Sequence, residues 1–227
     1  MTAPRSILII GASRGLGLGL ASEFAAQGWA VTATVRSAAQ EAPLQGLGVR
    51  VEQLEMTDSA SLEQLAGRLS GQQFDVIFVN AGVAGPSHHS TAQASAEEMG
   101  QLFLTNAVAP LRVAERLLPN LAAGHGLIVF MSSILGSIEA GAGLGMPLYG
   151  ASKAALNHLV QCFVRTQDNP HLGVLLMHPG WVRTDMGGAD APLDIDSSCK
   201  GMVEQIGAAV GQAGLHYLDY QGNALPW

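Results

Sequence analysis

The sequence has 227 residues, of which 48% are hydrophobic and only 13% are charged, and its formal net charge is −7. The acidic balance argues against a nucleic-acid-binding protein, because such proteins need a basic face. The length suits one α/β domain, and the low charged fraction predicts a well-filled core and an apolar surface that another subunit covers.

The first predicted elements are a strand, a glycine-rich turn and a helix. Residues 6–10 form a short apolar run with β-branched side chains, typical of a buried parallel strand, and residues 18–27 form a helical stretch that ends at a glycine. Between them, Gly11, Gly15 and Gly17 would let the backbone turn tightly and approach a pyrophosphate, to which the helix N-terminus offers free N–H groups. Their spacing differs from the commonest dinucleotide fingerprint, but their position between strand and helix predicts a phosphate-binding turn.

Strand and helix signals alternate along the rest of the sequence. Further apolar runs that indicate buried strands lie at residues 30–35, 49–54, 74–79, 127–131 and 174–177. Helical stretches fall between the strands, at residues 59–69, 97–121 and 148–166. This alternation predicts an α/β fold in which a single Rossmann-type, doubly wound parallel sheet carries helices on both faces. We expect residues 1–227 to form one dinucleotide-binding catalytic domain, with ligands at the C-terminal ends of the strands.

Tyr149 and Lys153 are four residues apart in a predicted helix and therefore share one face of it. A free tyrosine has a pKa of about 10, and a neighbouring cation lowers it. The pair could therefore donate or accept a proton in carbonyl chemistry. By itself the motif also fits an unremarkable pair on a surface helix.

These motifs together resemble those of the short-chain dehydrogenase/reductase family. The matching segments run from residue 10 to residue 184, with further similarity beyond, although Ile10 stands where the family usually has a threonine. The resemblance implies a catalytic tetrad of Asn106, Ser133, Tyr149 and Lys153. Besides Tyr149 and Lys153, the cofactor-binding residues that it implies are Gly11, Ser13, Arg14, Gly15, Leu16, Gly17, Asp58, Asn80, Ala81, Gly82, Pro179, Gly180, Val182 and Thr184.

The resemblance also implies a role for each member of the tetrad. Ser133 would donate a hydrogen bond to the substrate oxygen, and Tyr149 would supply the proton. Lys153 would lower the pKa of Tyr149 and bind the nicotinamide ribose, while Asn106 would orient a water that links Lys153 to solvent. We assign the serine role to Ser133 because Gly136 lies three residues further on, as in the family pattern.

The residues after the second strand indicate which nicotinamide cofactor is used. Enzymes that use NAD place an acidic residue there, against the ribose hydroxyls, but this sequence has Thr34, Val35 and Arg36. Arg36, and Arg14 within the glycine turn, could instead bind a 2′-phosphate through their planar guanidinium groups. Arg36 could also be merely solvated. We expect NADP(H) to be the cofactor.

Two further segments, residues 177–188 and 217–227, resemble sniffer-type carbonyl reductases and bacterial C-factor proteins. This resemblance implies NADPH-dependent reduction of a small-molecule carbonyl, with alcohol oxidation as the reverse reaction. Apolar residues flank the catalytic motifs and predict an apolar ketone, aldehyde or quinone as the substrate: Val83, Leu135, Met146, Trp181 and Met186. Because C-factor proteins are associated with cell–cell signalling, a signalling or NADP-sensing protein with incidental turnover is the alternative.

The sequence contains neither a metal-binding spacing nor a disulfide framework, since its two cysteines, Cys162 and Cys199, stand alone. Residues 7–10 are too short a run for a signal peptide, and no run approaches the length of a membrane span. We therefore expect a cytoplasmic protein without a metal site, nucleic-acid partner or membrane partner.

The helical stretches at 97–121 and 148–166 are apolar on more than the one stripe that a sheet would cover. In the family these two helices pair across a two-fold axis. We therefore expect a symmetric homodimer or a homotetramer. The alternative is that the same apolar side chains face the core of their own chain.

Overall fold

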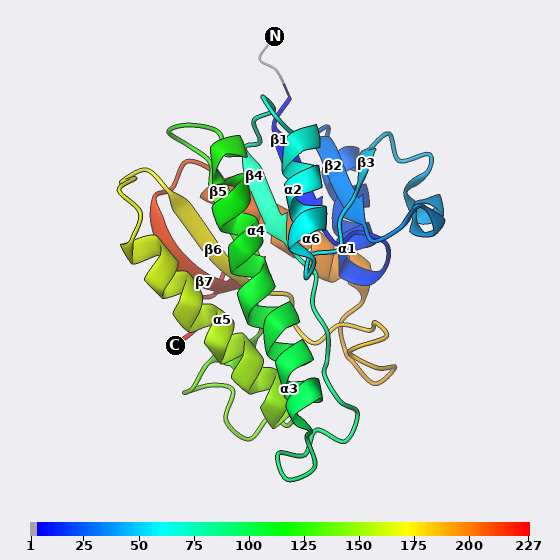
Figure 1. The fold of residues 1–227 in the computed structure, drawn as a ribbon, viewed down its shortest axis with the longest axis vertical. Helices are drawn as coiled ribbons and strands as arrows, with labels where there is room; N and C mark the ends of the chain where they lie inside the picture. Colours follow the sequence, from blue (N-terminus) through cyan, green and yellow to red (C-terminus); the bar gives the residue numbers. More distant parts are fainter. Residues whose placement is uncertain (1–3) are drawn as a thin grey trace.

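A sheet of seven parallel strands forms the centre of the computed structural model, which describes residues 4–227 (Figure 1). The strands follow the order β3-β2-β1-β4-β5-β6-β7, so the direction of winding reverses between β1 and β4. Their bounds are β1 Ser6–Ile10, β2 Ala30–Val35, β3 Arg50–Gln53, β4 Val76–Val79, β5 Leu127–Met131, β6 Gly173–His178 and β7 Gly214–Asp219. Ligands bind at the carboxyl edge of such sheets, next to the reversal.

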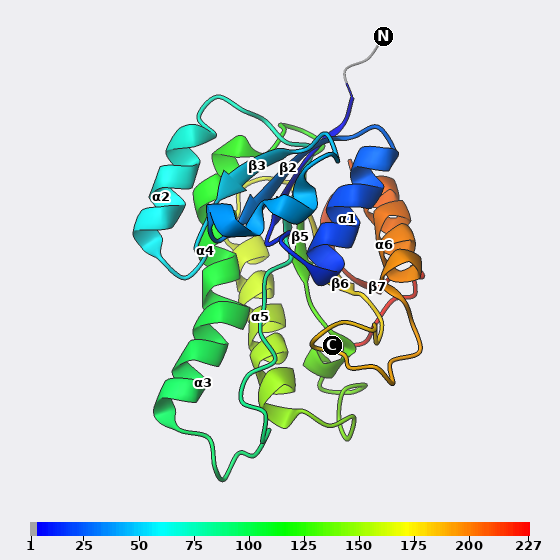
Figure 2. The same cartoon turned by 90° about the vertical axis from the view of Figure 1, so that its right-hand side faces the viewer.

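Helices cover both faces of the sheet and confirm the predicted Rossmann-type α/β fold. Figure 2 shows α2, α4 and α5 on one side of the strands and α1 and α6 on the other. The helix bounds are α1 Gly15–Ala26, α2 Ser59–Arg68, α3 Ala96–Phe103, α4 Ala109–Leu117, α5 Pro147–Arg165 and α6 Ile195–Ala209. Each helical layer packs its own apolar core against one face of the sheet.

The central strands are apolar at successive positions because both of their faces are covered. Every residue of β4 and β5 is buried, as are the last four residues of β1. Alternate residues of one strand enter opposite cores: Ile77 packs with α4 and α5, whereas Phe78 packs with α1 and α6. Continuous apolar runs are the pattern expected of buried parallel strands, and the sequence shows them clearly.

Two elements, α6 and β7, were not among the elements expected from the sequence. The strand β7 has the sequence GLHYLD, contains no β-branched residue and buries only Tyr217. Helix α6 contains two glycines, two serines and a cysteine, all weak helix formers. Tertiary packing and an N-cap at Asp194, whose carboxylate accepts a bond of 2.7 Å from the Ser197 N–H, hold this helix.

The helix expected at residues 97–121 is interrupted. It consists of α3, a π-helical turn η3 at Leu104–Val108, α4, and a 3₁₀ turn η4 at Leu118–Asn120. Pro110 lacks an N–H group and cannot continue the regular hydrogen bonding of an α-helix through this region. Such π-turns frequently lie at functional sites, and η3 contains Asn106.

The chain doubles back after β7. Asp219 caps a tight turn, because its carboxylate accepts bonds of 2.9 Å from the backbone N–H groups of Gln221 and Asn223. Leu218 then pairs antiparallel with Ala224, and the Leu225 N–H donates to the Tyr217 carbonyl at 2.9 Å. The returning segment therefore lies along the second half of β7.

Within residues 4–227, none of the helices combines the length and the hydropathy that crossing a bilayer requires.

Candidate active site

The glycine turn after β1 is packed too closely for side chains. Gly11 has φ +86°, and its N–H donates to the Thr34 hydroxyl at 2.9 Å. A Cβ atom on Gly11 would lie 2.7 Å from the Cβ of Ala81, and one on Gly17 would lie 2.0 Å from the Gly11 carbonyl oxygen. The Asn80 amide donates to that same oxygen at 2.7 Å. Asn80 and Ala81 thus hold the turn in shape from the neighbouring strand.

The N-terminus of α1 is open to an anion. Its N-cap residue is Arg14, whose side chain makes no capping hydrogen bond, and its first turn contains no acidic residue. The first N–H groups of a helix have no partner within the helix and carry a partial positive charge. The turn from Gly11 to Gly17 can therefore hold a phosphate group.

The two arginines expected to bind a 2′-phosphate lie at the same edge of the sheet. Arg36 is exposed and follows β2 directly, next to the turn that follows β1. Arg14 forms an exposed ion pair with Asp185 from the loop after β6. Together with Arg183 and Thr184, this pair lines an open depression of about 490 Å³. Because an exposed pair contributes only about 0–1 kcal/mol, Arg14 can exchange Asp185 for another anion.

Asp58, expected to touch an adenine ring, serves as the N-cap of α2. Its carboxylate accepts a bond of 2.9 Å from the Ala60 N–H, and its side chain is exposed after β3. Substituting such a cap typically costs about 1 kcal/mol of stability. The other carboxylate oxygen can still meet a ligand at the sheet edge.

Asn106 is fully buried in the π-turn and fixes the loop after β4. Its amide oxygen accepts from the Val83 N–H and its amide nitrogen donates to the Val83 carbonyl, both at 2.8 Å. The same nitrogen donates to the Ser152 hydroxyl of α5 at 3.0 Å. A Cβ atom on Gly82 would lie 3.2 Å from the Asn106 oxygen and 3.4 Å from Lys153 Nζ. Asn106, Gly82 and Lys153 are therefore neighbours.

Ser133, Tyr149 and Lys153 also come together, at the ends of β5 and α5. Lys153 Nζ donates to the Met131 carbonyl of β5 at 2.9 Å and lies 5.6 Å from the centre of the Tyr149 ring. Ser133 follows β5 in extended conformation, and its hydroxyl accepts a bond of 3.2 Å from the Leu135 N–H. That bond leaves the hydroxyl hydrogen of Ser133 free to be donated.

Burial controls the protonation of this group. Burial raises the pKa of Tyr149 above its usual value, and a hydrogen bond with Ser133 only partly offsets that effect. Burial also lowers the pKa of Lys153 to about 8. The pKa of Tyr149 therefore shifts in the direction opposite to the lowering expected from Lys153, because burial removes the phenolate from water.

The loop after β6 is held by its own side chains and by side chains of α6 and of the segment after β7. Gly180 has φ +82°, and a Cβ atom there would lie 2.9 Å from Leu193 and 3.0 Å from the Tyr220 ring. The Ser198 hydroxyl donates to the Pro179 carbonyl at 2.6 Å. Val182 is buried, and the Thr184 hydroxyl accepts a bond of 3.1 Å from the Gly187 N–H. These contacts give the loop one shape.

Exposed apolar side chains surround the carboxyl edge of the sheet on three loops. Except for Trp227, the large hydrophobic side chains that are exposed among residues 4–227 belong to the loops after β4, β5 and β6: Val83, Ile138, Leu144, Trp181 and Met186. We call these five residues the apolar rim. Trp181 is 57% exposed although its indole N–H donates to the Gly187 carbonyl at 2.8 Å, so it both anchors its loop and presents its ring.

The sequence prediction included three members of the apolar rim but missed Ile138 and Leu144. Both lie in a stretch rich in glycine between Ser137 and Met146, which has no periodic pattern. The other two pocket candidates, Leu135 and Met146, are half-buried at the ends of this stretch. Only the fold brings the stretch, which follows β5 and Ser133, to the carboxyl edge of the sheet. Residues 4–227 contain no cluster of side chains suited to a metal ion.

A family model for short chain dehydrogenases matches residues 5–192. The chain belongs to the short-chain dehydrogenase family. A crystal structure of a carbonyl reductase from Pseudomonas aeruginosa PAO1 in complex with NADP is 40% identical, covers 99% of this chain and 100% of its own, and superposes with a TM-score of 0.90. Carbonyl reductase Sniffer of D. melanogaster is 30% identical with the same coverages and a TM-score of 0.87.

A relative named C-signal, from Myxococcus xanthus, is 36% identical over 154 residues, which are 67% of this chain and 92% of that protein. The similarities to Sniffer and to C-signal confirm the predicted resemblances to sniffer-type carbonyl reductases and to C-factor proteins. As a member of this family, the chain is an oxidoreductase.

Proposed function

We propose that this protein reduces an apolar ketone, aldehyde or quinone with NADPH, and that Tyr149 donates the proton. The observation that carries the proposal is the meeting of Ser133, Tyr149 and Lys153 at the sheet edge, beside an open glycine turn and under the apolar rim. The similarity to a carbonyl reductase crystallised with NADP supports both the reaction and the cofactor.

The cofactor would lie across the carboxyl ends of the strands, and when bound it supplies a hydride to the carbonyl carbon. The turn of Gly11, Ser13, Gly15, Leu16 and Gly17 would hold its pyrophosphate through backbone N–H groups. Arg14 and Arg36 would contact the 2′-phosphate and Asp58 the adenine. The segments 80–82 and 179–184, with Tyr149 and Lys153, would hold the nicotinamide half.

Ser133 and Tyr149 act on the substrate oxygen, where negative charge develops. The hydroxyl of Ser133 accepts from Leu135, and its own hydrogen would be donated to the substrate oxygen. The raised pKa of Tyr149 keeps the phenol protonated at neutral pH, as a proton donor requires. Lys153, still mostly charged at neutral pH, stabilises the phenolate that remains. Asn106 fixes the loop beside Lys153.

The test is NADPH oxidation with a panel of quinones, aldehydes and apolar ketones, repeated with NADH. We expect turnover with NADPH and a higher kcat/KM than with NADH. Tyr149→Phe should abolish turnover and leave NADPH binding unchanged in a fluorescence titration. Turnover by this variant within tenfold of wild type would refute the proton-donor role, and a preference for NADH would refute the cofactor assignment.

The similarity to C-signal supports one alternative, an NADP-sensing or signalling protein with incidental turnover. This alternative predicts tight NADPH binding without turnover on any carbonyl of the panel.

We further propose that residues 1–227 act as one catalytic domain in the cytoplasm and assemble as a homodimer or homotetramer. An interface between copies would have to use other side chains than Leu111, Val113, Leu156 and Val160, because these are buried in the core of their own chain.

A further inference from the structure

Tyr217 of β7 contacts the backbone of the active-site serine. Its side chain is only 3% exposed, and its hydroxyl donates to the Ser133 carbonyl. The same carbonyl accepts a bond of 2.8 Å from the Gly136 N–H and so closes the 3₁₀ turn η5 at Ile134–Gly136. Two donors from different parts of the chain therefore fix one carbonyl oxygen.

Helix α5 holds this turn from one side. A Cβ atom on Gly136 would lie 2.9 Å from the backbone and Cβ of Lys153, so the turn rests directly on the helix. Asn157 donates to the Gly136 carbonyl at 3.3 Å and accepts from the Ser132 hydroxyl at 2.7 Å. These contacts place η5 relative to Tyr149 and Lys153, but they leave the carbonyl of Ser133 to other donors.

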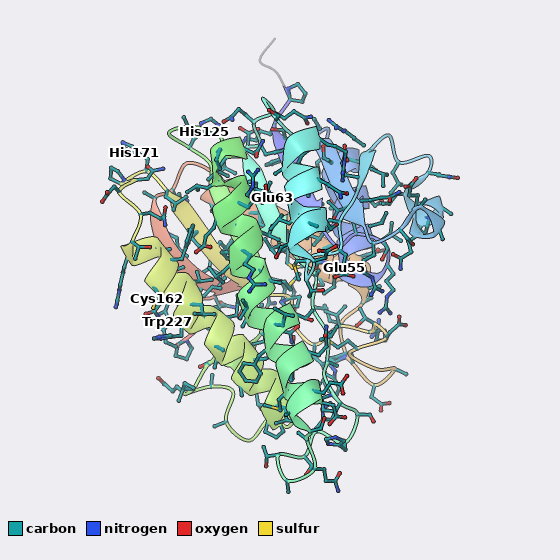
Figure 3. The ribbon with its side chains drawn as sticks, viewed as in Figure 1. Glu55, Glu63, His125, Cys162, His171 and Trp227 are labelled. Carbon is teal, nitrogen blue, oxygen red and sulfur yellow. The ribbon has the colours of Figure 1, made fainter. Side chains whose placement is uncertain are left out.

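The segment that returns after β7 holds the turn from the other side. The Tyr217 ring packs against the Trp227 ring at 5.5 Å between centres, and the Glu139 N–H donates to the Trp227 carbonyl at 3.3 Å. Figure 3 shows Trp227 beside α5. We call Tyr217 and Trp227 together the β7 clasp. The β7 clasp contacts the loop after β5 twice: Tyr217 bonds the Ser133 carbonyl at the start of the loop, and Trp227 bonds the N–H of Glu139 six residues later.

The β7 clasp contacts Ser133, whose hydroxyl must be placed accurately against the substrate oxygen. A group that hydrogen-bonds a reacting oxygen must be held to within about 0.5 Å, by side chains whose own positions are fixed. Ser133 is followed by residues 138–146, an exposed stretch with three glycines, which cannot hold it rigidly.

We propose that Tyr217 is a positioning residue, which acts through the Ser133 carbonyl to place the Ser133 hydroxyl against the substrate oxygen, with Trp227 fixing the Tyr217 ring. This inference rests on the proposed carbonyl reduction. It predicts a loss of kcat when the Tyr217 hydroxyl is removed, without weaker NADPH binding, because the cofactor residues lie on other segments.

The experiment is Tyr217→Phe, which removes the hydroxyl and keeps the ring. The matched control is Asn120→Ala, which removes a buried bond of 2.8 Å to the Leu69 carbonyl and a partly buried bond of 2.9 Å to the Gln72 carbonyl. Asn120 precedes β5 and therefore lies at the opposite edge of the sheet. We expect kcat of Tyr217→Phe to fall about tenfold, the effect of one buried hydrogen bond, with the NADPH Kd within about twofold of wild type. The control should unfold at lower temperature and keep its kcat.

Hydrogen exchange of the Gly136 amide, measured by NMR, reports the same contact without turnover. Its exchange should quicken about tenfold in Tyr217→Phe and stay unchanged in Asn120→Ala. Equal kcat in Tyr217→Phe and wild type, or an equal fall in both variants, would overturn the proposal. If the wild type turns over no carbonyl, the proposed function fails, and unchanged Gly136 exchange in Tyr217→Phe would then overturn the contact as well.

Trp227→Leu provides a second variant should Tyr217→Phe not fold. It keeps the Tyr217 hydroxyl but removes the ring that fixes it, and aromatic pairs of this kind contribute about 0.5–1.5 kcal/mol. We expect kcat to fall about threefold and the Gly136 amide to exchange faster. Wild-type values for both would overturn the part assigned to Trp227.

Discussion

Gly17→Ala should disable the glycine turn through a single methyl group. The new Cβ would lie 2.0 Å from the Gly11 carbonyl oxygen and 2.7 Å from the Asn80 amide nitrogen, so the turn or the helix start must move by about 1 Å. Overpacking of this kind costs about 1–3 kcal/mol, whereas alanine gains about 1 kcal/mol over glycine in a helix. The net loss of stability should therefore be at most about 2 kcal/mol.

NADPH binding should weaken as well as stability. A displaced turn no longer directs its N–H groups at the pyrophosphate, and each charge-assisted hydrogen bond contributes about 1.5–3 kcal/mol. One lost bond already raises Kd at least tenfold. A fluorescence titration with NADPH measures this, with thermal unfolding recorded on the same samples.

Gly207→Ala is the matched control for this substitution. Gly207 lies within α6, and no atom would approach its Cβ within 4 Å. The change should stabilise the protein by several tenths of a kcal/mol and leave NADPH binding unaltered. If Gly17→Ala bound NADPH within twofold of wild type, the close contact between Gly17 and Gly11 would not be what shapes the phosphate site.

Three further predictions concern the charge of Lys153, the carboxylate of Asp75 and the oligomeric state. Burial lowers the pKa of Lys153 to about 8, so the charge that would stabilise the Tyr149 phenolate is lost as pH rises through 8. A pH series of initial rates should therefore show kcat/KM for a carbonyl falling above pH 8. A flat profile up to pH 9 would contradict this prediction. Burial raises the pKa of Asp75, but bonds from Ser6 and His125 outweigh it and hold the pKa below its usual value. The carboxylate therefore contributes stability above about pH 4 that is lost as pH falls through the folded pKa, and urea unfolding between pH 3 and 6 should show a smaller pH dependence for Asp75→Asn than for wild type. Light scattering should give at least twice the 23.5 kDa of one chain, and a monomer mass at micromolar concentration would refute the proposed assembly.

The elements of the fold could be predicted from the sequence where the hydrophobic pattern is strong. Runs such as Leu127–Met131 are buried on both faces and are therefore apolar throughout. Edge strand β7 is half-exposed and lacks β-branched residues, so its sequence carries no such pattern. The break at η3 was also missed, because a single π-turn leaves the residues before and after it helical and adds no distinctive residue pattern.

The candidate residues could be named from motifs, but their mutual contacts could not. Nothing in the sequence shows that Asn80 bonds the Gly11 carbonyl or that Arg14 pairs with Asp185, since these partners are 69 and 171 residues apart. The pKa of Tyr149 depends chiefly on burial, which raises it. The four-residue spacing on a helix shows that Tyr149 and Lys153 are neighbours, but it does not show that both side chains are buried away from water.

The return of the chain along β7 affects how copies of the protein can join. An edge strand offers unpaired N–H and C=O groups to which another chain can add. Here the Leu218–Ala224 pairing and the bond from Leu225 to Tyr217 occupy part of that edge. A continuous sheet running from β7 of one copy into β7 of another is therefore blocked over the second half of this strand. Along that half of the strand, two copies that associate must join through helices or loops, because strand pairing of the kind that bare sheet edges allow is not available there.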